Sequence, residues 1–166
     1  MAEFIFDLAL PPVAVERVSQ VIGLAETIFG PIDGSDLEWR LGHLPDPSLF
    51  LASDPAGLVG FKFGYASTST RYHSWLGGVA LRARRQGIAR QLMHFQHSWL
   101  LSRGYSEIET GTIGSNESMH QLNLEFGFKV IGSYNRDGMP RIMLHKRLAP
   151  ADTPAVRPDW PLKLAL

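Results

Sequence analysis

The stretch of sequence that decides the fold runs from residue 79 to residue 90 and reads Val79-Ala80-Leu81-Arg82-Ala83-Arg84-Arg85-Gln86-Gly87-Ile88-Ala89-Arg90. It predicts a strand that runs into an arginine-rich turn, followed by an amphipathic helix that begins at Gly87. The first amides of a helix have no intrahelical acceptor and lie at the positive end of its dipole. The stretch therefore predicts an anion site in which backbone amides cradle phosphate oxygens.

Two interpretations of this turn remain open at the level of local sequence. Glycine at position 87 lets a ligand approach the backbone closely, and the small side chain of Ala89 leaves the next turn clear. A solvated basic turn before an ordinary helix-start glycine accounts for the same residues equally well.

Downstream of the turn, the pattern predicts helices that alternate with strands. Apolar residues at helical spacing form one stripe between Gly87 and Ser102, and Gly104 stands where a helix C-cap belongs. The pattern continues with a strand at 107–112, a helix that carries Met119, Leu122 and Phe126 and stops at Gly127, and a hairpin of strands 128–134 and 141–146.

Upstream of the turn, strands predominate. We expect a strand at 4–6, a helix that ends at Phe29, a weaker helix at 36–41, a hairpin of strands 48–53 and 58–66, and a strand at 73–81. The order of strands first and then β-α-β-α-β-β implies an α/β (α+β) fold, in which helices pack on a mixed sheet.

Composition limits the class of protein. The 166 residues fit one domain, and the absence of cysteine excludes disulfides, thiolate metal sites and cysteine nucleophiles. The 16 basic and 16 acidic side chains give zero formal net charge, so we expect neither nucleic acid nor a membrane as a partner. No apolar run approaches the ~20 residues of a membrane span, and no signal-peptide pattern follows Met1, which predicts a cytoplasmic protein.

The chain divides into a body, residues 1–147, and a proline-rich tail, residues 148–166. Four prolines in the tail prevent it from continuing a sheet or a helix. A disordered tail is one interpretation. Trp160 and the apolar run 162–166 favour the other, in which the tail docks on the body or on the second chain of a homodimer.

The six residues Arg84-Arg85-Gln86-Gly87-Ile88-Ala89 resemble the acetyl-CoA signature of the GCN5-related N-acetyltransferases, the GNAT superfamily, which reads Arg/Gln-x-x-Gly-x-Gly/Ala. A second segment, Asn116-Glu-Ser-Met119 followed by Leu122-Asn123 and Gly127-Phe128, is similar to the family's Asn-x-x-Ala…Leu-Tyr-x-x-x-Gly-Phe segment. The resemblance is best between Ser74 and Tyr134, and the first half of the chain fits only in the order of its elements.

The resemblance implies a mixed, mostly antiparallel sheet with splayed central strands, and an N-acetyltransferase that uses acetyl-CoA as co-substrate and no metal. In the family the pyrophosphate lies on the amides of the turn, and the pantetheine arm pairs with the strand before it. Asn116 then helps to hold the pantetheine arm or caps the following helix. The cofactor-binding residues implied are Val79, Leu81, Arg84, Arg85, Gln86, Gly87, Ile88, Ala89, Arg90 and Asn116.

The proton donor is one departure from the family. Family members often carry a tyrosine, placed to protonate the leaving thiolate, where this chain has Asn123. An amide supplies no proton at neutral pH, so another group donates the proton, or solvent or amides assist the thiolate. Tyr134, at the end of the strand after Phe128, is the candidate donor, and a sheet-packing tyrosine with a surface hydroxyl is the alternative.

The attacking amine must lose a proton, and His73 is the candidate base. It begins the strand that leads into the turn, where several family members carry a glutamate or a histidine. Period-two alternation places His73, Trp75, Gly77 and Val79 on one face of this strand. An exposed strand-start histidine is the alternative, and Glu109 on the neighbouring strand is the second candidate base.

Two other features favour structural interpretations. His94 and His97 lie one helical turn apart, but no third ligand is evident, so we expect a polar helix face rather than a metal site. The glycines at 77 and 78 predict a bulge or a close backbone approach inside their strand.

The leading interpretation of function is the transfer of an acetyl group from acetyl-CoA to a primary amine of a small molecule or peptide. A non-catalytic acyl-CoA-binding or sensing domain is the alternative, because the family's tyrosine is missing. A nucleotide-binding module without acyl chemistry fits less well, since Gly87 lacks the Lys-Ser/Thr of a P-loop. Residues 29–44 are expected to contact the acceptor. Their acidic side chains would attract a cationic amine, or the segment is an ordinary solvated loop.

Overall fold

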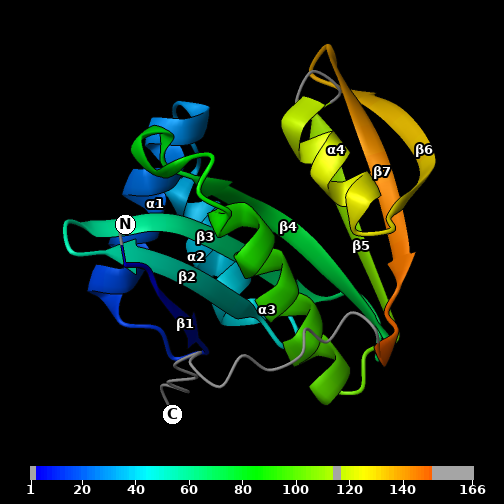
Figure 1. Cartoon of the computed structure of the whole chain (residues 1–166), viewed down its shortest axis with the longest axis horizontal. Helices are drawn as coiled ribbons and strands as arrows, with labels where there is room; N and C mark the ends of the chain where they lie inside the picture. The colour runs from blue at the N-terminus through cyan, green and yellow to red at the C-terminus, as the bar shows by residue number, and fades with distance from the viewer. Residues whose placement is uncertain (1–2, 114–116, 151–166) are drawn as a thin grey trace.

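The computed structural model describes residues 3–113 and 117–150, which form one seven-stranded sheet with helices on both faces (Figure 1). The strands are β1 (Ile5–Ala9), β2 (Ser48–Asp54), β3 (Gly57–Ala66), β4 (Arg71–Val79), β5 (Glu107–Ile113), β6 (Lys129–Arg136) and β7 (Met139–Arg147). The helices are α1 (Val15–Phe29), α2 (Gly34–His43), α3 (Ile88–Ser102) and α4 (Glu117–Glu125), with a short 3-10 helix η1 (Leu81–Ala83).

The strand order is β1-β2-β3-β4-β5-β7-β6. Only the β4–β5 pair is parallel, and the other neighbours are antiparallel, which confirms the expected mixed, mostly antiparallel sheet. The predicted order of helices and strands is also confirmed, with one change at the end of β4. Leu81, predicted to continue the strand, begins η1 instead.

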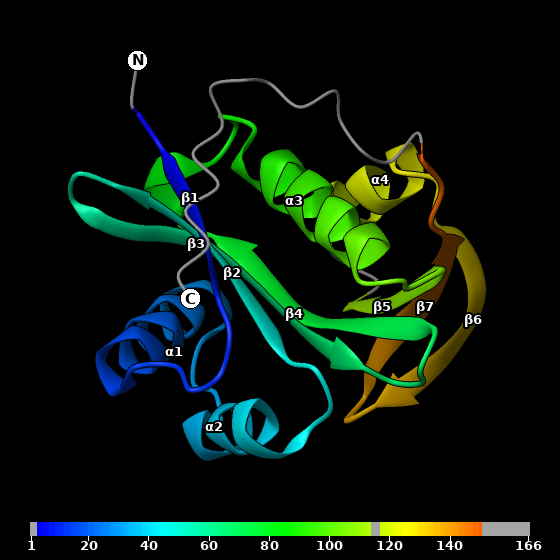
Figure 2. The ribbon, with the colours of Figure 1, turned by 90° about the horizontal axis from the view of Figure 1, so that it is seen from below.

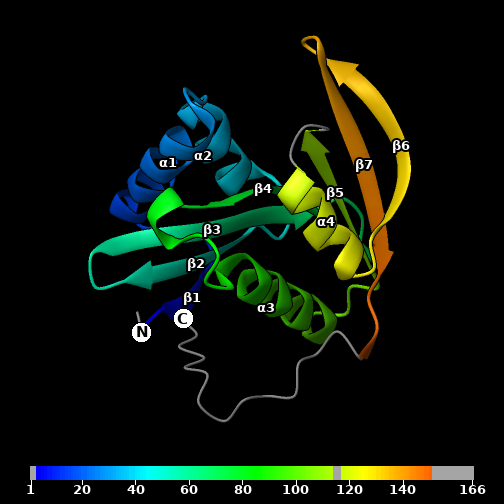
Figure 3. The same cartoon turned by 45° about the horizontal axis from the view of Figure 1, so that its top comes forward.

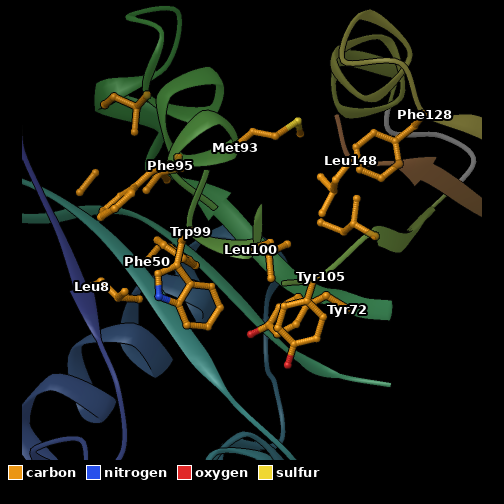
Figure 4. Close-up of a cluster of buried hydrophobic side chains, with 14 of the residues drawn as sticks. Leu8, Phe50, Tyr72, Met93, Phe95, Trp99, Leu100, Tyr105, Phe128 and Leu148 are labelled. Carbon is orange, nitrogen blue, oxygen red and sulfur yellow. The ribbon is translucent and has the colours of Figure 1, made fainter. Parts of the chain in front are cut away.

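Two hydrophobic cores lie on opposite faces of the sheet. Figure 2 shows α1 and α2 on one face and α3 and α4 on the other. On the α3 face, Phe50, Tyr72 and Trp99 pack edge to face, with ring centroids 5.7 and 6.0 Å from that of Trp99 (Figure 4). On the α1 face, Phe61 and Phe63 of β3 are buried against α1 and α2. The sheet is therefore covered on both sides next to its central strands.

The two central strands separate after a short stretch of pairing. Residues 71–74 of β4 pair with residues 107–110 of β5, and the Thr110 hydroxyl donates to the Ser74 carbonyl at 2.9 Å. Beyond these positions β4 and β5 no longer pair with each other, and Figure 3 shows the two strands diverging. We call the point of separation, just after Ser74 and Thr110, the fork. The expected splay of the central strands is confirmed.

A β-bulge in β4 corrects the predicted alternation of side chains. Phe63 pairs with Leu76 while Gly64 pairs with Ser74, so Trp75 is an extra residue in β4. Trp75 and Leu76 consequently both pack on the α1 face. The prediction of one face for His73, Trp75, Gly77 and Val79 is therefore wrong, because the bulge reverses the alternation after Trp75. Val79 packs against the α3-face core.

The body of the protein closes with Leu148, the first residue of the predicted tail. Its side chain is buried in the α3-face core, and its amide donates to the Ser106 carbonyl at 2.9 Å. The rest of the tail, from residue 151, lies outside the described residues. Within residues 3–113 and 117–150, no helix has the length and apolar character needed to cross a membrane.

Candidate functional site

The turn between β4 and α3 has two residues in the left-handed backbone region. Arg85 has φ 60° and Gly87 has φ 79°. Glycine adopts this conformation without strain, and a Cβ built on Gly87 would meet no atom within 4 Å. The space beside Gly87 is thus open to a ligand that approaches the backbone.

The N-terminus of α3 carries no side-chain cap. Gly87 is its N-cap residue and has no side chain to accept from the first-turn amides, while its carbonyl accepts from the Gln91 amide at 3.0 Å. The amides of the first turn are therefore available to an external acceptor, and the helix dipole favours an anion there. This geometry supports the anion-site interpretation of residues 84–89.

Several arginines around the turn already have partners. Arg82 forms a salt bridge with Asp54, and Arg90 forms one with Glu125 of α4. These contacts lower the pKa of both carboxyls, first through the hydrogen bond that each arginine donates. Arg85 is exposed and has no ion-pair partner among residues 3–113 and 117–150. The turn therefore presents backbone amides and the exposed cation of Arg85.

The last residue of β4, Val79, directs its backbone amide and carbonyl away from β3. The Ala80 amide donates to the Val59 carbonyl of β3 at 2.7 Å, so the polar groups of Val79 point to the opposite edge, beyond the fork. The Arg84 Nε donates to the Val79 carbonyl at 3.1 Å, and a carbonyl has a second lone pair for a ligand. Leu81, the other predicted pantetheine contact, lies in η1 and is exposed.

The two candidate bases form a pair at the fork. His73 and Glu109 lie opposite each other in the β4–β5 register, and the His73 Nδ1 is 3.5 Å from the Glu109 Oε1. Each side chain is 19% exposed. Burial lowers the pKa of His73, although the Glu109 carboxylate works in the opposite direction. The structure therefore gives a neutral imidazole at pH 7 whose Nδ1–H is directed to a carboxylate.

Three side chains that the sequence did not single out for the site surround this pair. The Arg40 guanidinium of α2 stacks on the Trp75 ring at 4.2 Å and donates to the Tyr65 hydroxyl at 2.7 Å. The Tyr65 ring lies 5.3 Å from the His73 ring. Burial raises the pKa of Tyr65, so its hydroxyl keeps its proton at neutral pH. The sequence signals were the alternation that places Trp75 beside His73 and the same alternation that places Tyr65 on one strand face with Phe61 and Phe63.

Further charged groups extend the site along β5 and β7. The His145 Nε2 lies 2.9 Å from the Glu107 Oε1, and the Arg71 Nη2 lies 3.5 Å from the Glu107 Oε2. These contacts, His145 foremost, lower the pKa of Glu107. The α1 face at the fork therefore combines aromatic rings with carboxylates that are paired with Arg71 and His145.

Tyr134, the predicted proton donor, is not brought close to this pair. It lies on the edge strand β6, where its side chain is 47% exposed. It pairs with Arg141, which pairs with Ile113, four residues along β5 from Glu109. At about 3.3 Å per residue, that is about 13 Å along the strand. Its role as the acid stays a prediction, and Asn116 lies outside the described residues.

The histidine pair on α3 differs from the expected polar helix face. His97 is fully buried, and the Lys146 Nζ lies 3.5 Å from its Nδ1. Burial, together with neighbouring cations, lowers the pKa of His97 well below its usual value, so the ring is neutral. Within the described ranges, no cluster of three or more His, Cys, Asp or Glu side chains offers a metal site.

Solved structures with this fold include several acetyltransferases. The ribosomal-protein-S18-alanine N-acetyltransferase from Escherichia coli matches with a TM-score of 0.74 and 13% identity, covering 87% of this chain and 95% of that chain. A GNAT family acetyltransferase from Elizabethkingia anophelis with acetyl-CoA bound matches with a TM-score of 0.68 and 16% identity, covering 87% and 98%. A putative phosphinothricin N-acetyltransferase matches at 0.72 and 17%, covering 87% and 99%. At these identities the likeness establishes the fold.

No curated protein matches this sequence. A family model does match, over residues 18–128, and its description is "Acetyltransferase (GNAT) family". The match includes β4, the turn, α3 and the fork, so it covers the elements that build the site. The chain belongs to the acetyltransferase (GNAT) family.

Proposed function

We propose that this protein transfers an acetyl group from acetyl-CoA to a primary amine of a small molecule or peptide. The observation that carries the proposal is the fork itself. Beyond the fork, β4 continues through Val79 toward the uncapped N-terminus of α3. The His73–Glu109 pair lies at the base of the fork, where β4 and β5 still pair. An anion site and a base thus lie at opposite ends of the same splayed strand.

The residues around the turn fit the anionic part of CoA. The amides from Arg84 to Ala89, with Arg85 as a free cation, would hold the pyrophosphate, and the backbone of Val79 would pair with the pantetheine arm. Arg90 lies just inside the helix, where its salt bridge to Glu125 ties α3 to α4. When bound, acetyl-CoA supplies an activated acyl group as a thioester.

The residues at the base of the fork fit the amine. With its ring hydrogen on Nδ1, which faces the Glu109 carboxylate, His73 would use the Nε2 lone pair to take a proton from the incoming ammonium. The neutral nitrogen then attacks the thioester carbon, the C–N bond forms, the C–S bond breaks, and the electron pair leaves on sulfur. After the attack the nitrogen is positively charged and carries two hydrogens, of which one passes to solvent as a proton and the other stays as the amide N–H.

The test is the release of free CoA thiol from acetyl-CoA in the presence of an amine panel. The panel includes polyamines, amino-acid amides and short peptides with free N-termini, because the α1 face carries both acidic and aromatic groups. We expect thiol release that depends on at least one amine. Tight binding of acetyl-CoA without amine-dependent release from any member of the panel would instead support the acyl-CoA-sensing alternative.

A further inference from the structure

The α3 face of the fork holds a group of buried polar side chains that the proposed chemistry above does not use. Lys62 of β3 is 8% exposed, Gln96 and His97 of α3 are 0%, Thr112 of β5 is 6%, and Asn123 of α4 is 2%. We call these five residues the buried polar cluster. Buried polar groups are costly unless they are hydrogen-bonded, so their gathering at one place requires an explanation.

The elements that carry the cluster meet at the fork. The Gln96 amide lies 3.4 Å from the hydroxyl of Ser74, the last residue of β4 that pairs with β5. Thr112 lies two residues beyond Thr110 on β5. The His97 ring lies 5.7 Å from the Phe126 ring, just past the end of α4. The cluster residues therefore come from elements that adjoin the fork on its α3 face.

The Lys62 side chain begins beside a glycine of β4. Lys62 pairs with Gly77, and a Cβ built on Gly77 would lie 3.5 Å from the Lys62 Cγ. Neighbouring Cβ atoms on adjacent strands are usually about 4.5–5.5 Å apart, so the lysine leans over β4 at a position without a side chain. Gly77 lies beyond the fork, so Lys62 neighbours the part of β4 that does not pair with β5. The Lys62 charge is also close enough to His97 to help lower the pKa of that ring.

The charge of the cluster is positive and uncompensated. Lys62 has no ion pair among the described residues, and the cluster contains no carboxylate. Burial lowers the pKa of Lys62 to about 8, so the ammonium form still predominates at pH 7. Burying a cation without a partner is destabilising, and an apolar residue would be more stable here. The lysine favours an anion that is not part of the folded chain.

The unpartnered atoms of the cluster are mostly donors. The Lys146 Nζ donates to the His97 Nδ1, which leaves the ring hydrogen on Nε2, and this Nε2 has no partner. The Asn123 Nδ2 and the Thr112 hydroxyl are also buried without a hydrogen-bond partner. Among the buried atoms of the cluster that lack a partner, the Gln96 Oε1 is the one that can only accept. An excess of donors around a cation is the chemistry of a site that receives negative charge.

We propose that Lys62 protonates the CoA thiolate as it leaves, with Asn123 as a neighbouring donor that stabilises the negative sulfur. The inference rests on the proposed acetyl transfer. As the C–S bond breaks, the electron pair stays on sulfur and a proton passes from the Lys62 Nζ to it. The neutral lysine then regains a proton from solvent. Solvent also receives the proton lost by the amide nitrogen and the proton that His73 took from the ammonium and then releases. Lys62 thereby does the work that a tyrosine at the position of Asn123 would do.

The acidity of the two partners is well matched. An ordinary cysteine thiol has a pKa of about 8.5, close to the pKa of about 8 that burial gives Lys62. Proton transfer between groups of similar pKa is efficient, and general acid catalysis is typically worth about 10²–10⁴ in rate. Lys62→Met should therefore lower kcat by that order and leave the KM for acetyl-CoA nearly unchanged.

The decisive experiment titrates the thiol of bound CoA by its thiolate absorbance, with desulfo-CoA as the blank. In the wild-type complex we expect the pKa of the thiol to lie at least one unit below that of free CoA. Lys62→Met should remove this shift, and Lys129→Met, which removes an exposed lysine of β6, should keep it. Lys62→Arg should keep a lowered thiol pKa but lose turnover, since a guanidinium does not give up its proton.

Five outcomes would overturn the inference. An unshifted thiol pKa in the wild-type complex would overturn the inference by itself, without a measurement on any variant. A shift that survives Lys62→Met, or a loss of kcat in Tyr134→Phe but not in Lys62→Met, assigns the acid elsewhere. A Lys62-dependent preference of tenfold or more for succinyl-CoA over butyryl-CoA shows a site for an acyl carboxylate. Failure of the wild-type protein to bind CoA would refute the proposed acetyl transfer as well as the role of Lys62. The other outcomes refute only the role of Lys62.

Discussion

The two residues that the sequence offers as rival bases are neighbours in the folded protein. His73 and Glu109 are 36 positions apart in the chain, yet the parallel β4–β5 register places them opposite each other at the fork. Opposing effects act on the His73 imidazole, because burial lowers its pKa while the Glu109 carboxylate raises it. Burial is the larger effect, so the histidine is a neutral base that the carboxylate orients.

His73→Ala tests this assignment through the pH dependence of kcat/KM. General-base assistance is typically worth about 10²–10⁴ in rate, so we expect a loss of that order without weaker acetyl-CoA binding. In wild type, kcat/KM should fall as the pH drops through the pKa of His73, with a midpoint below 6.5 because burial and the Arg40 charge lower that pKa. The variant should lack this acidic limb.

Glu109→Gln is the matched variant on the neighbouring strand. Removing the carboxylate removes the contact that raises the pKa of His73, so the acidic limb should move to still lower pH while part of the activity remains. If Glu109→Gln abolished turnover while His73→Ala kept it with an unchanged pH profile, Glu109 would be the base.

At the scale of elements, the sequence predicted the strand, the turn and α3 well, because each has a strong local pattern. Gly87 starts the helix, and the apolar stripe of α3 continues to Ser102 as expected. The glycines at 77 and 78 predicted a bulge or a close backbone approach in this strand, and Gly78 does lie close to Ile28. The bulge itself is at Trp75, where two adjacent apolar residues that both fit a buried face give no signal of it. Pairing geometry, rather than residue type, decides which side chains of β4 face α3.

Gly87→Asp tests the N-terminus of α3 as the phosphate site. The carboxylate would lie beside the first-turn amides and repel the pyrophosphate, so we expect acetyl-CoA binding to be lost. Gly87→Asn is the control, because it has the same shape and imposes the same strain at φ 79° without the charge. Calorimetric titration of both variants separates charge from strain, and equal affinities for Asp and Asn would show that the phosphates bind elsewhere.

Gly78→Ala tests the close approach of α1 to β4. A Cβ on Gly78 would lie 2.9 Å from the Ile28 Cδ1 and 3.4 Å from the Phe29 ring, so both side chains must move. Overpacking of this kind typically costs about 1–3 kcal/mol in the free energy of unfolding. Gly132→Ala on β6, where the added Cβ meets nothing within 4 Å, should cost less in the same urea denaturation. Equal costs would argue against the packing of α1 on this glycine.

At the scale of the whole molecule, the sequence predicted the sheet and its splay but not how the site is assembled from distant parts. Arg40 of α2 and Lys62 of β3 reach the fork from the half of the chain that carries no family motif. Nothing in local sequence marks a lysine inside a strand as buried. The order of the strands in the sheet, which places β3 beside β4 and β4 beside β5, brings these residues together.

Two truncations test where the body ends and what the tail does. Ending the chain at Arg147 removes the buried Leu148 side chain and its backbone hydrogen bond, which should cost about 1.5–3 kcal/mol of unfolding free energy. Ending it at Pro150 keeps both and removes only residues 151–166. The predicted docking of the tail requires the second truncation to change the oligomer size in light scattering or to lower the Tm. A change in neither would show a tail that makes no stabilising contact.

The most direct test of the central claim is a crystal structure of the protein with acetyl-CoA. We predict pyrophosphate oxygens within hydrogen-bond distance, about 2.7–3.2 Å, of the amides between Arg84 and Ala89. The thioester should lie between the splayed segments of β4 and β5, with His73 on one face of the sheet and Lys62 on the other. Acetyl-CoA bound away from the fork, or with its pyrophosphate remote from the N-terminus of α3, would contradict this account.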